Sequence, residues 1–424
     1  MIYAGARLGL FLLGTCFTLP LLNAQESAKP LTLEAALASV ESAHPDLLVA
    51  QAERDSAIAD RDIASSRLDS SINLEGILRS GSRNPNLQDY YPDNSVRLTA
   101  RKTLYDFGRS SAAEEASASE VTAREADLLA VKEKRRLEVM SRFFDVLLAD
   151  MQFTADNEMM AVIYVGLDHG RDNLKAGKIS TVDLAELETR YQDIFTKRTA
   201  SSQRQRISRA LLANAMNRPG DLSADLEDPK LESNNRKLPD YDSLISILLV
   251  SNPRLLAQQE MLIASQKRLE SLRADKRPLL DAEVQAADFS RSAVTRDNLS
   301  AGLILSWPLY QGNKADARVA REMAQFNKAS ANTEKLKMDL TQALLETYME
   351  IVQLKSVGRS AAKSQVDFRD LVLERSRGLY ELELKSNLGT SMADTVEANL
   401  KARRAEYLLA LAWARLEAML GRPL

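Results

Sequence analysis

The sequence predicts a mainly α-helical protein with a small β part, built from two copies of one structural unit. Two very long helical patterns, at residues 110–175 and 314–385, cover much of the chain. Each pattern follows a pair of short segments whose apolar residues alternate as in β-strands. Ala, Leu, Glu, Lys and Arg are abundant and aromatic residues make up only 5% of the chain, which is typical of long helices and coiled coils.

The clearest strand signal ends at Trp307 and leads into a helix. Apolar residues occupy every second position there, at Leu299, Ala301, Leu303, Leu305 and Trp307. This alternation predicts a strand with one apolar face. Pro308 cannot donate to a β-ladder and so ends the strand, and Gly312 permits a turn into a helix that begins near Asn313.

An earlier copy of this stretch lies at residues 96–109. Apolar residues again alternate there, Leu104-Tyr105 matches Leu309-Tyr310, and Gly108 precedes the second helix start. Partner strands are predicted just before each copy, which gives one hairpin at about 70–104 and another at about 279–307. The strands are about ten residues long, a length that suits a tilted membrane strand.

Other landmarks repeat at similar offsets. Pro45 and Pro253 differ by 253 − 45 = 208, and Asp183 and Asp394 differ by 394 − 183 = 211. The sequence Arg-Pro recurs near the end of each half. The chain therefore divides into a first repeat at 25–220, a linker at 221–239 and a second repeat at 240–424.

The N-terminus predicts a secretory signal peptide at residues 1–24. Arg7 precedes an apolar run from Leu8 to Leu22, and the small residue Ala24 marks a cleavage site. The alternative is an uncleaved membrane anchor. Cleavage after Ala24 would remove Cys16, the one cysteine, so neither a disulfide nor thiol chemistry is expected.

The helices have recognisable starts and reversals. Thr32 is an expected N-cap for a helix at 33–43, and proline restarts a helix after His44 and again after Asn252. These two helices should run to about residues 68 and 274. Gly177 and Gly389 each mark a reversal, with return helices at 181–216 and 392–420.

The first long helix carries a coiled-coil seam. Apolar residues step by three and four at Leu137, Met140, Phe144, Leu147 and Met151. At about 1.5 Å per residue, each long pattern could reach roughly 100 Å if it is continuous. A single globular domain needs no rod of that length.

The four strands require a shared barrel if they cross a membrane. No run of residues after the N-terminus is long and apolar enough for a membrane helix, and four strands cannot close a barrel alone. Two chains would supply 2 × 4 = 8 strands and three chains 3 × 4 = 12, enough for a lumen. Aromatic residues at the helix-side strand ends fit a membrane girdle: Tyr105, Phe107, Trp307 and Tyr310. The alternative is a soluble strand pair with an aromatic edge.

Several motifs together resemble the TolC family of outer-membrane channel proteins. They are Leu-Thr-Leu-Glu-Ala-Ala-Leu at 31–37, His-Pro-Asp-Leu at 44–47, Leu-Tyr-Asp-Phe-Gly at 104–108, Trp-Pro-Leu-Tyr-Gln-Gly at 307–312, and the Gly-to-Asp stretches 177–183 and 389–394. The resemblance implies a long α-helical coiled-coil barrel in the periplasm. It also implies four β-strands per chain that contribute to a shared 12-stranded outer-membrane barrel in a homotrimer.

The resemblance also suggests where the pore narrows. Asp394 and Glu397 are three residues apart near a helix start and match an acidic pair that constricts the pore in the family. The alternative is that both carboxylates only favour a helix N-terminus. Asp183 and Glu186 repeat the spacing, and there the helix-start explanation is preferred. Ser386 and Ser391 stand where the family archetype has a Tyr and an Arg that latch the closed state.

No constellation of residues indicates catalysis. His44 and His169 lie far apart without metal-ligand spacing, and the nucleotide-binding glycine motifs are absent. We therefore expect neither enzyme activity nor a cofactor nor a metal site, and a net charge of −3 gives no sign of nucleic-acid binding.

The leading function is an outer-membrane channel of a tripartite efflux or type I secretion system. The resemblance implies a passive trimeric duct in a Gram-negative bacterium, driven by an inner-membrane transporter through a periplasmic adaptor, with outer-membrane lipid around the barrel. The alternative is a periplasmic coiled-coil adaptor, but an adaptor should have one helical hairpin flanked by compact β domains.

Overall fold

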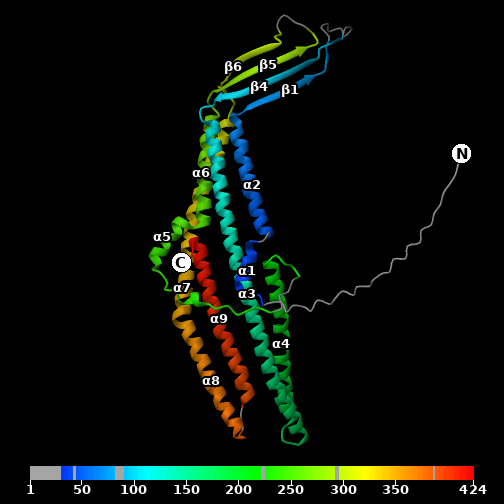
Figure 1. The fold of residues 1–424 in the computed structure, drawn as a ribbon, viewed down its shortest axis with the longest axis vertical. Helices are drawn as coiled ribbons and strands as arrows, with labels where there is room; N and C mark the ends of the chain where they lie inside the picture. The colour runs from blue at the N-terminus through cyan, green and yellow to red at the C-terminus, as the bar shows by residue number, and fades with distance from the viewer. Residues whose placement is uncertain (1–29, 42–43, 82–89, 221–224, 292–295, 385–386) are drawn as a thin grey trace, which may run out of the picture.

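The computed structural model describes residues 30–41, 44–81, 90–220, 225–291, 296–384 and 387–424. The predicted signal peptide lies outside this part of the chain. The molecule is elongated, with a β-sheet at one end and the tips of two helical hairpins at the other (Figure 1). The short helices and the C-terminus lie near the middle of the long axis.

The two repeats have the same order of elements. The helices are α1 Leu33–Ala38, α2 Pro45–Ser65, α3 Arg109–Lys175, α4 Thr181–Ala215, α5 Tyr241–Ser251, α6 Pro253–Ala274, α7 Lys314–Gln353, α8 Arg359–Glu381 and α9 Leu388–Leu420. Single turns of 3₁₀-helix lie at η1 Ser39–Glu41, η2 Ser66–Leu68 and η3 Glu232–Asn235. The strands are β1 Ser70–Ile77, β2 Ser80–Gly81, β3 Tyr91–Pro92, β4 Ser95–Tyr105, β5 Leu279–Phe289 and β6 Leu299–Ser306.

The predicted helix starts are confirmed by side-chain caps. The Thr32 hydroxyl accepts from the Ala35 N–H at 3.2 Å, and His44 Nδ1 accepts from the Asp46 N–H at 3.2 Å. In the second repeat, Asn252 Oδ1 accepts from the Leu255 N–H at 2.9 Å. Each side chain satisfies a backbone donor that has no partner within its helix.

The two long helical patterns differ in continuity. In the first repeat, α3 is one unbroken helix of 67 residues, as the pattern predicts. The second pattern ends at Glu381 rather than at residue 385, and a π-helical turn at Leu354–Gly358 separates α7 from α8. One of the predicted return helices, α9, starts at Leu388, four residues before the expected position 392.

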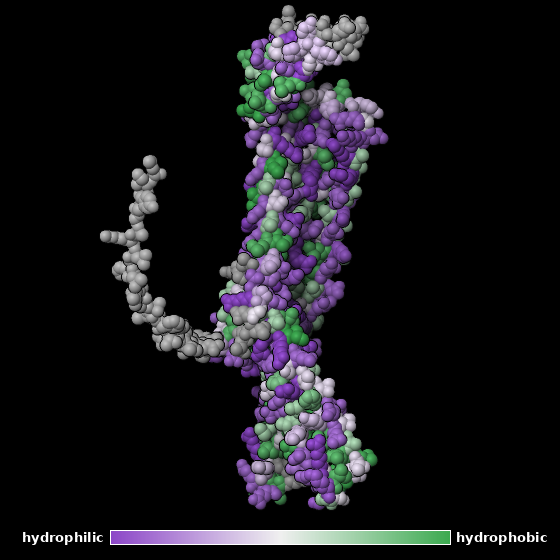
Figure 2. Space-filling view, turned by 90° about the vertical axis from the view of Figure 1, so that its right-hand side faces the viewer, coloured by the Kyte–Doolittle hydropathy of each residue, from purple (hydrophilic) through white to green (hydrophobic). Residues whose placement is uncertain are grey.

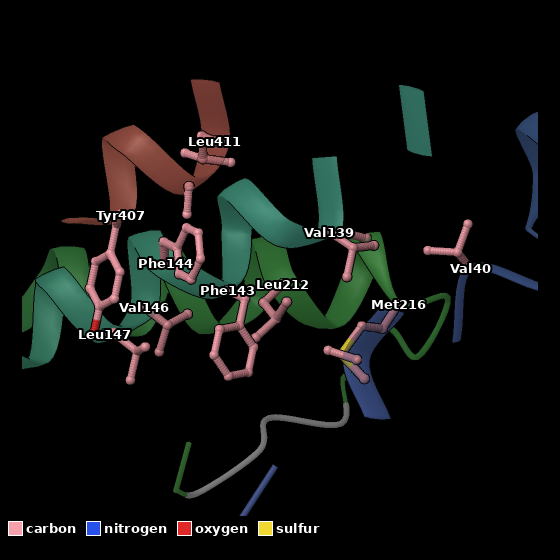
Figure 3. Packing of buried hydrophobic residues seen from close by; sticks show 13 residues of the cluster. Val40, Val139, Phe143, Phe144, Val146, Leu147, Leu212, Met216, Tyr407 and Leu411 are labelled. Carbon is pink, nitrogen blue, oxygen red and sulfur yellow. The ribbon is translucent and has the colours of Figure 1, made fainter. Parts of the chain in front are cut away.

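The apolar core joins the repeats at mid-length. Phe144 and Leu147 of the predicted seam are buried, but Val139, Phe143 and Val146 are buried as well. The buried face of α3 is wider than one seam because α2, α4, α6 and α9 all pack against it. In Figure 3, Phe144 of α3 faces Tyr407 of α9, and their rings stack with centroids 4.5 Å apart.

The two predicted hairpins form one sheet. The strand order is β1-β4-β5-β6 and all neighbours are antiparallel. The central pair, β4 and β5, joins the first repeat to the second, with Ser95 opposite Phe289. The sequence did not predict the short β2–β3 ribbon in the connection between β1 and β4.

Candidate channel site

One face of the sheet is polar and held by ion pairs across the strands. Alternation along each strand brings charged residues of neighbouring strands to this face. Glu75 lies 3.6 Å from Arg97, and Arg101 Nε donates to Glu283 at 2.9 Å. The Thr103 hydroxyl donates to Asp281 at 2.8 Å. The Glu75–Arg97 pair lies within the first hairpin, whereas the carboxylates of Asp281 and Glu283 in the second hairpin pair with Thr103 and Arg101 of the first.

The opposite face of the sheet is apolar and open. Its side chains include Ile72, Leu74, Val96, Leu98, Val284, Leu299, Leu303 and Leu305, all exposed. Leu303, for example, is 68% exposed. Figure 2 shows hydrophobic residues gathered on one side of the sheet end, while hydrophilic residues cover much of the middle of the helical body. A contiguous exposed apolar surface of this kind indicates a lipid or protein contact.

The junctions between the sheet and the long helices contain the aromatic and glycine residues predicted for a barrel–helix junction. Tyr105 ends β4, and its ring meets that of Phe107 edge to face at 4.7 Å. Trp307 and Pro308 directly follow β6, and Trp307 is more than half exposed. Gly108 and Gly312 both have positive φ, 83° and 62°, and lie one and two residues before the long helices α3 and α7.

Sequence reasoning missed the residue that fixes the first junction, Asp106. Its buried carboxylate accepts from the Ser110 N–H at 2.7 Å and from the Gly108 N–H at 3.2 Å. These bonds satisfy backbone donors at the start of α3. An Asp two residues before a glycine that opens a helix is a signal that could have identified it.

The first helical tip is closed by a turn and a capping box. Gly177 has φ 69°, and the Lys178 N–H donates back to the Asn173 carbonyl at 2.8 Å. The Ser180 backbone N–H and hydroxyl donate to Asp183 at 2.8 Å each, and the Asp183 N–H returns a bond to Ser180 Oγ at 3.2 Å. The Ser180 N–H and hydroxyl hold the pKa of Asp183 below its usual range.

The second tip repeats this turn, but Glu383 occupies the glycine position. Glu383 has φ 55°, and the Leu384 N–H donates to the Leu379 carbonyl at 2.9 Å. The residue with positive φ in the second turn is therefore Glu383 and not the expected Gly389, because a non-glycine residue makes this turn.

Gly389 has a different structural role from the one expected. It lies in the first turn of α9. A Cβ there would stand 2.9 Å from Val162 Cγ2 on α3. The glycine lets the second hairpin approach the first closely.

The predicted constriction residues each pair with a cation of the same chain. Asp394 lies 2.7 Å from Arg369 of α8, and Glu397 lies 2.8 Å from Lys401 one turn along α9. Ser391, at the family's latch position, is buried with its hydroxyl 2.8 Å from that of Ser376. Ser386 falls outside the described residues.

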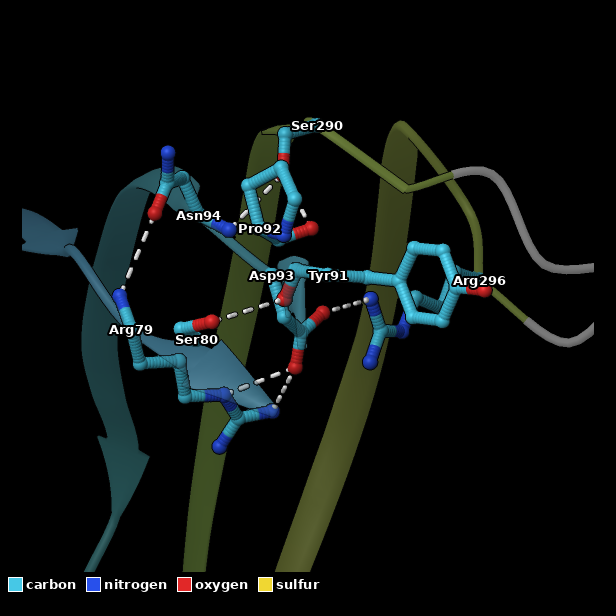
Figure 4. A network of polar contacts seen from close by, with 8 residues as sticks. All are labelled: Arg79, Ser80, Tyr91, Pro92, Asp93, Asn94, Ser290 and Arg296. Atoms are coloured by element: carbon cyan, nitrogen blue, oxygen red, sulfur yellow. Dashed lines mark hydrogen bonds and ion pairs between the residues drawn. The ribbon is translucent and has the colours of Figure 1, made fainter. Parts of the chain in front are cut away.

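The far end of the sheet holds a polar network that the sequence did not reveal. Asp93 accepts from Arg79 Nε at 2.7 Å and from Arg296 Nη1 at 3.1 Å (Figure 4). These hydrogen bonds lower the pKa of Asp93. The Asn94 N–H also donates to Ser290 Oγ at 2.7 Å. The network ties the connections of the two hairpins together.

The part of the chain that the structure describes was searched for membrane-spanning helices and for metal-binding groups. None of the helices there is long and apolar enough to span a bilayer. Nor does that part of the chain contain a group of three or more His, Cys, Asp or Glu side chains that could hold a metal ion.

The comparisons with known proteins agree with this architecture. A family model described as outer membrane efflux protein matches residues 36–218. No curated protein sequence matches the chain.

Three solved structures are similar over 92% of this chain. CusC is 17% identical, with 92% of its own chain covered and a TM-score of 0.73. VceC of Vibrio cholerae is 15% identical, with 96% covered and a TM-score of 0.72. MtrE of Neisseria gonorrhoeae, solved in an open state, is 16% identical, with 89% covered and a TM-score of 0.70.

The sequence match spans most of the first repeat, and the structural matches extend the same fold over the second. These solved structures are described as outer membrane proteins or channels. Residues 36–218 are therefore similar to the outer membrane efflux protein family, and the chain has the TolC-like fold of these solved channels.

Proposed function

We propose that three copies of this chain form a passive export duct across the outer membrane and periplasm. The observation that carries the proposal is the four-stranded sheet, with one polar ion-paired face and one exposed apolar face. Its edge strands, β1 and β6, each pair with one inner strand and have no strand on their outer side in the described part of the chain. Joining β1 of one copy to β6 of the next would complete the backbone hydrogen bonds that a bilayer requires. Three sheets give 12 strands, with the polar faces around the lumen.

Crosslinking of the sheet edges tests this arrangement. Cysteines replace Asn73 on β1 and Ser300 on β6, and a short bis-maleimide is added to membranes. The proposal expects covalent dimers and trimers on a denaturing gel. As a matched control, cysteines replace Thr99 and Gln285, which face each other inside one sheet and should give monomers only. Monomers alone from the edge pair would contradict the shared barrel.

We infer that the helical tips meet a periplasmic adaptor and an inner-membrane transporter. The turns at Gly177 and ahead of Gly389 lie at the end of the molecule opposite the sheet (Figure 1). Apolar side chains are exposed there, including Leu382, Leu384 and Val182. As a passive duct, the protein would catalyse no reaction and would depend on the transporter for energy. Photocrosslinkers at Lys178 and Thr390 should capture a periplasmic partner, and capture only from the sheet end would oppose this orientation.

We propose further that Asp394 and Glu397 line the narrow part of the pore. Three copies would bring six carboxylates together, which would favour cations at neutral pH. The Arg369 pair tempers this charge, so the Arg369→Gln variant should increase cation selectivity. The Asp394→Ala/Glu397→Ala variant should decrease it in planar-bilayer recordings. Equal selectivity in all three proteins would mean that the two acids only serve the local helix structure.

A further inference from the structure

The second helical hairpin contains a break that the first lacks. Between α7 and α8, at Leu354–Gly358, the backbone hydrogen bonds of the helix follow a π-helical pattern. The Arg359 N–H there donates to the Leu354 carbonyl, five residues earlier. In the first repeat α3 is α-helical throughout its 67 residues. A π turn interrupts the regular ladder and is a site where a helix bends. The outgoing helix of the second repeat therefore has a local hinge between α7 and α8.

The linker between the repeats covers this hinge. The Lys355 ammonium, inside the π turn, donates to the backbone carbonyl of Arg236. Arg359, directly after the turn, donates to Asn235 Oδ1 at 3.0 Å and pairs with Glu406 of α9 at 2.6 Å. Linker residues thus contact the hinge within the widened turn and directly after it.

A buried tryptophan lies beneath these contacts. Trp413 of α9 is 1% exposed. The Arg236 guanidinium lies 4.8 Å from the centre of its ring system and the Lys355 ammonium 5.6 Å. Both cations are within the range at which the face of an indole attracts positive charge. Arg236 also pairs with Glu417 of α9 at 2.5 Å.

The linker is fixed to α9 by a second buried group. Asn234 has no exposed surface, and its Nδ2 donates to the backbone carbonyl of Glu406 at 3.0 Å and to its carboxylate at 2.8 Å. Both bonds use the amide nitrogen of Asn234, whose side-chain oxygen is buried without a hydrogen-bond partner. The linker therefore bridges the hinge of α7–α8 to the neighbouring helix.

A cavity lies beside the linker. A cavity of about 780 Å³ is lined by Ser233, Arg236 and Glu417 together with Leu137 and Met140 of α3. Close-packed interiors resist displacement, whereas a cavity admits it. Arg236 can therefore move without displacing core side chains.

We propose that residues 233–236 act as a clasp that sets the bend at the π turn, so that opening the clasp lets α8 swing relative to α7. The 23 residues of α8 give a lever about 35 Å long at about 1.5 Å per residue. A bend of about 10° would move its tip by roughly 6 Å. The consequence for passage rests on the proposed function, whereas the hinge itself does not.

The test measures the distance between the two hairpin tips in the full protein. Spin labels replace the exposed residues Lys178 and Arg377, and labelled chains are diluted with unlabelled chains so that only pairs within one chain contribute. The Lys355→Met variant removes the ammonium and keeps most of the side-chain volume. In this variant we expect the ratio of conformers with long tip distances to conformers with short tip distances to rise by on the order of tenfold. The reason is that the variant loses one hydrogen bond and one cation–π contact. Lys363→Met, an exposed site on α8, is the matched control and should match the parent.

A second, milder variant distinguishes a loss of the clasp from a general folding defect. Asn235→Ala removes one exposed contact to Arg359 and should shift the distances in the same direction, by less. Unchanged distances in both variants would overturn the clasp, as would an equal shift in Lys363→Met. The conductance of the same proteins in planar bilayers tests the export duct separately from the clasp. Shifted distances without any pore current would support the clasp and contradict the duct.

Discussion

At the residue scale, Glu383 is the clearest departure from local backbone preference. It holds the left-handed conformation that Gly177 holds in the first repeat, with φ 55° against 69°. Non-glycine residues are strained there because the side chain crowds the backbone. Such strain is common at functional positions, and Glu383 lies among exposed apolar residues at the inferred partner-binding tip.

The first prediction is that Glu383→Gly steadies the second tip. Relief of the left-handed strain is worth about 1 kcal/mol, which is roughly a fivefold slower local opening. Hydrogen exchange at the Leu384 amide, which bonds to Leu379, measures that opening. The reverse change, Gly177→Glu, should speed exchange at the Lys178 amide by a similar factor. Equal rates in parent and variants would mean that the turn carries no strain.

The second prediction concerns pH at the first tip. The pKa of Asp183 is lowered in the folded state by the Ser180 donors, so its contribution to stability is present above its unfolded pKa of about 4. The contribution is lost as the pH falls through the lower folded value. We expect the first turn of α4 to fray in that acidic window. Asp183→Asn should remove the acid-dependent loss of protection of the Ser180 amide, measured relative to an unstructured peptide at the same pH. An unchanged protection profile would contradict the capping-box explanation.

At the element scale, local rules predicted most boundaries and failed at two places. Side-chain caps and proline positions located α1, α2 and α6 because these signals act within three or four residues. Alternation located the four long strands. The π turn left no such signal, since one widened turn does not change the hydrophobic pattern. The second turn was expected at Gly389 because glycine was taken as the marker of a turn that Glu383 makes instead.

The third prediction tests the two faces of β6. Leu303→Arg places a charge on the exposed apolar face, and a charge at the middle of a bilayer costs about 2–4 kcal/mol. Ser300→Arg, three residues earlier on the polar face, should be tolerated. The yield of heat-resistant assembled protein in membranes measures the difference. Equal yields would mean that Leu303 does not face lipid.

The fourth prediction concerns the contact between the hairpins. Gly389→Ala places a methyl group 2.9 Å from Val162 Cγ2, and overpacking of this kind costs about 1–3 kcal/mol. Gly166→Ala on α3 meets no atom within 4 Å and should stabilise its helix by up to about 1 kcal/mol. Thermal unfolding followed by circular dichroism should show opposite shifts. A rise in the midpoint for both variants would remove the close-packing role of Gly389.

At the scale of the whole molecule, the repeat and the length of its helices could be predicted from sequence, but the contacts between repeats could not. The clasp joins Arg236 to Lys355 and Trp413, and the Asp93 network joins residues about two hundred positions apart. Such contacts depend on how the two units pack, and neither unit encodes them alone. The shared barrel was deduced instead from a count of strands, which is a property of the entire chain.

The assembly of three chains is the central claim, and the mass of the particle tests it most directly. Native mass spectrometry of protein extracted from membranes in mild detergent should show one species with the mass of three mature chains. Circular dichroism of the same sample should report the strand content of the sheet. A stable monomer that retains this β content would contradict the shared barrel, because four strands in one chain would then satisfy their own edges.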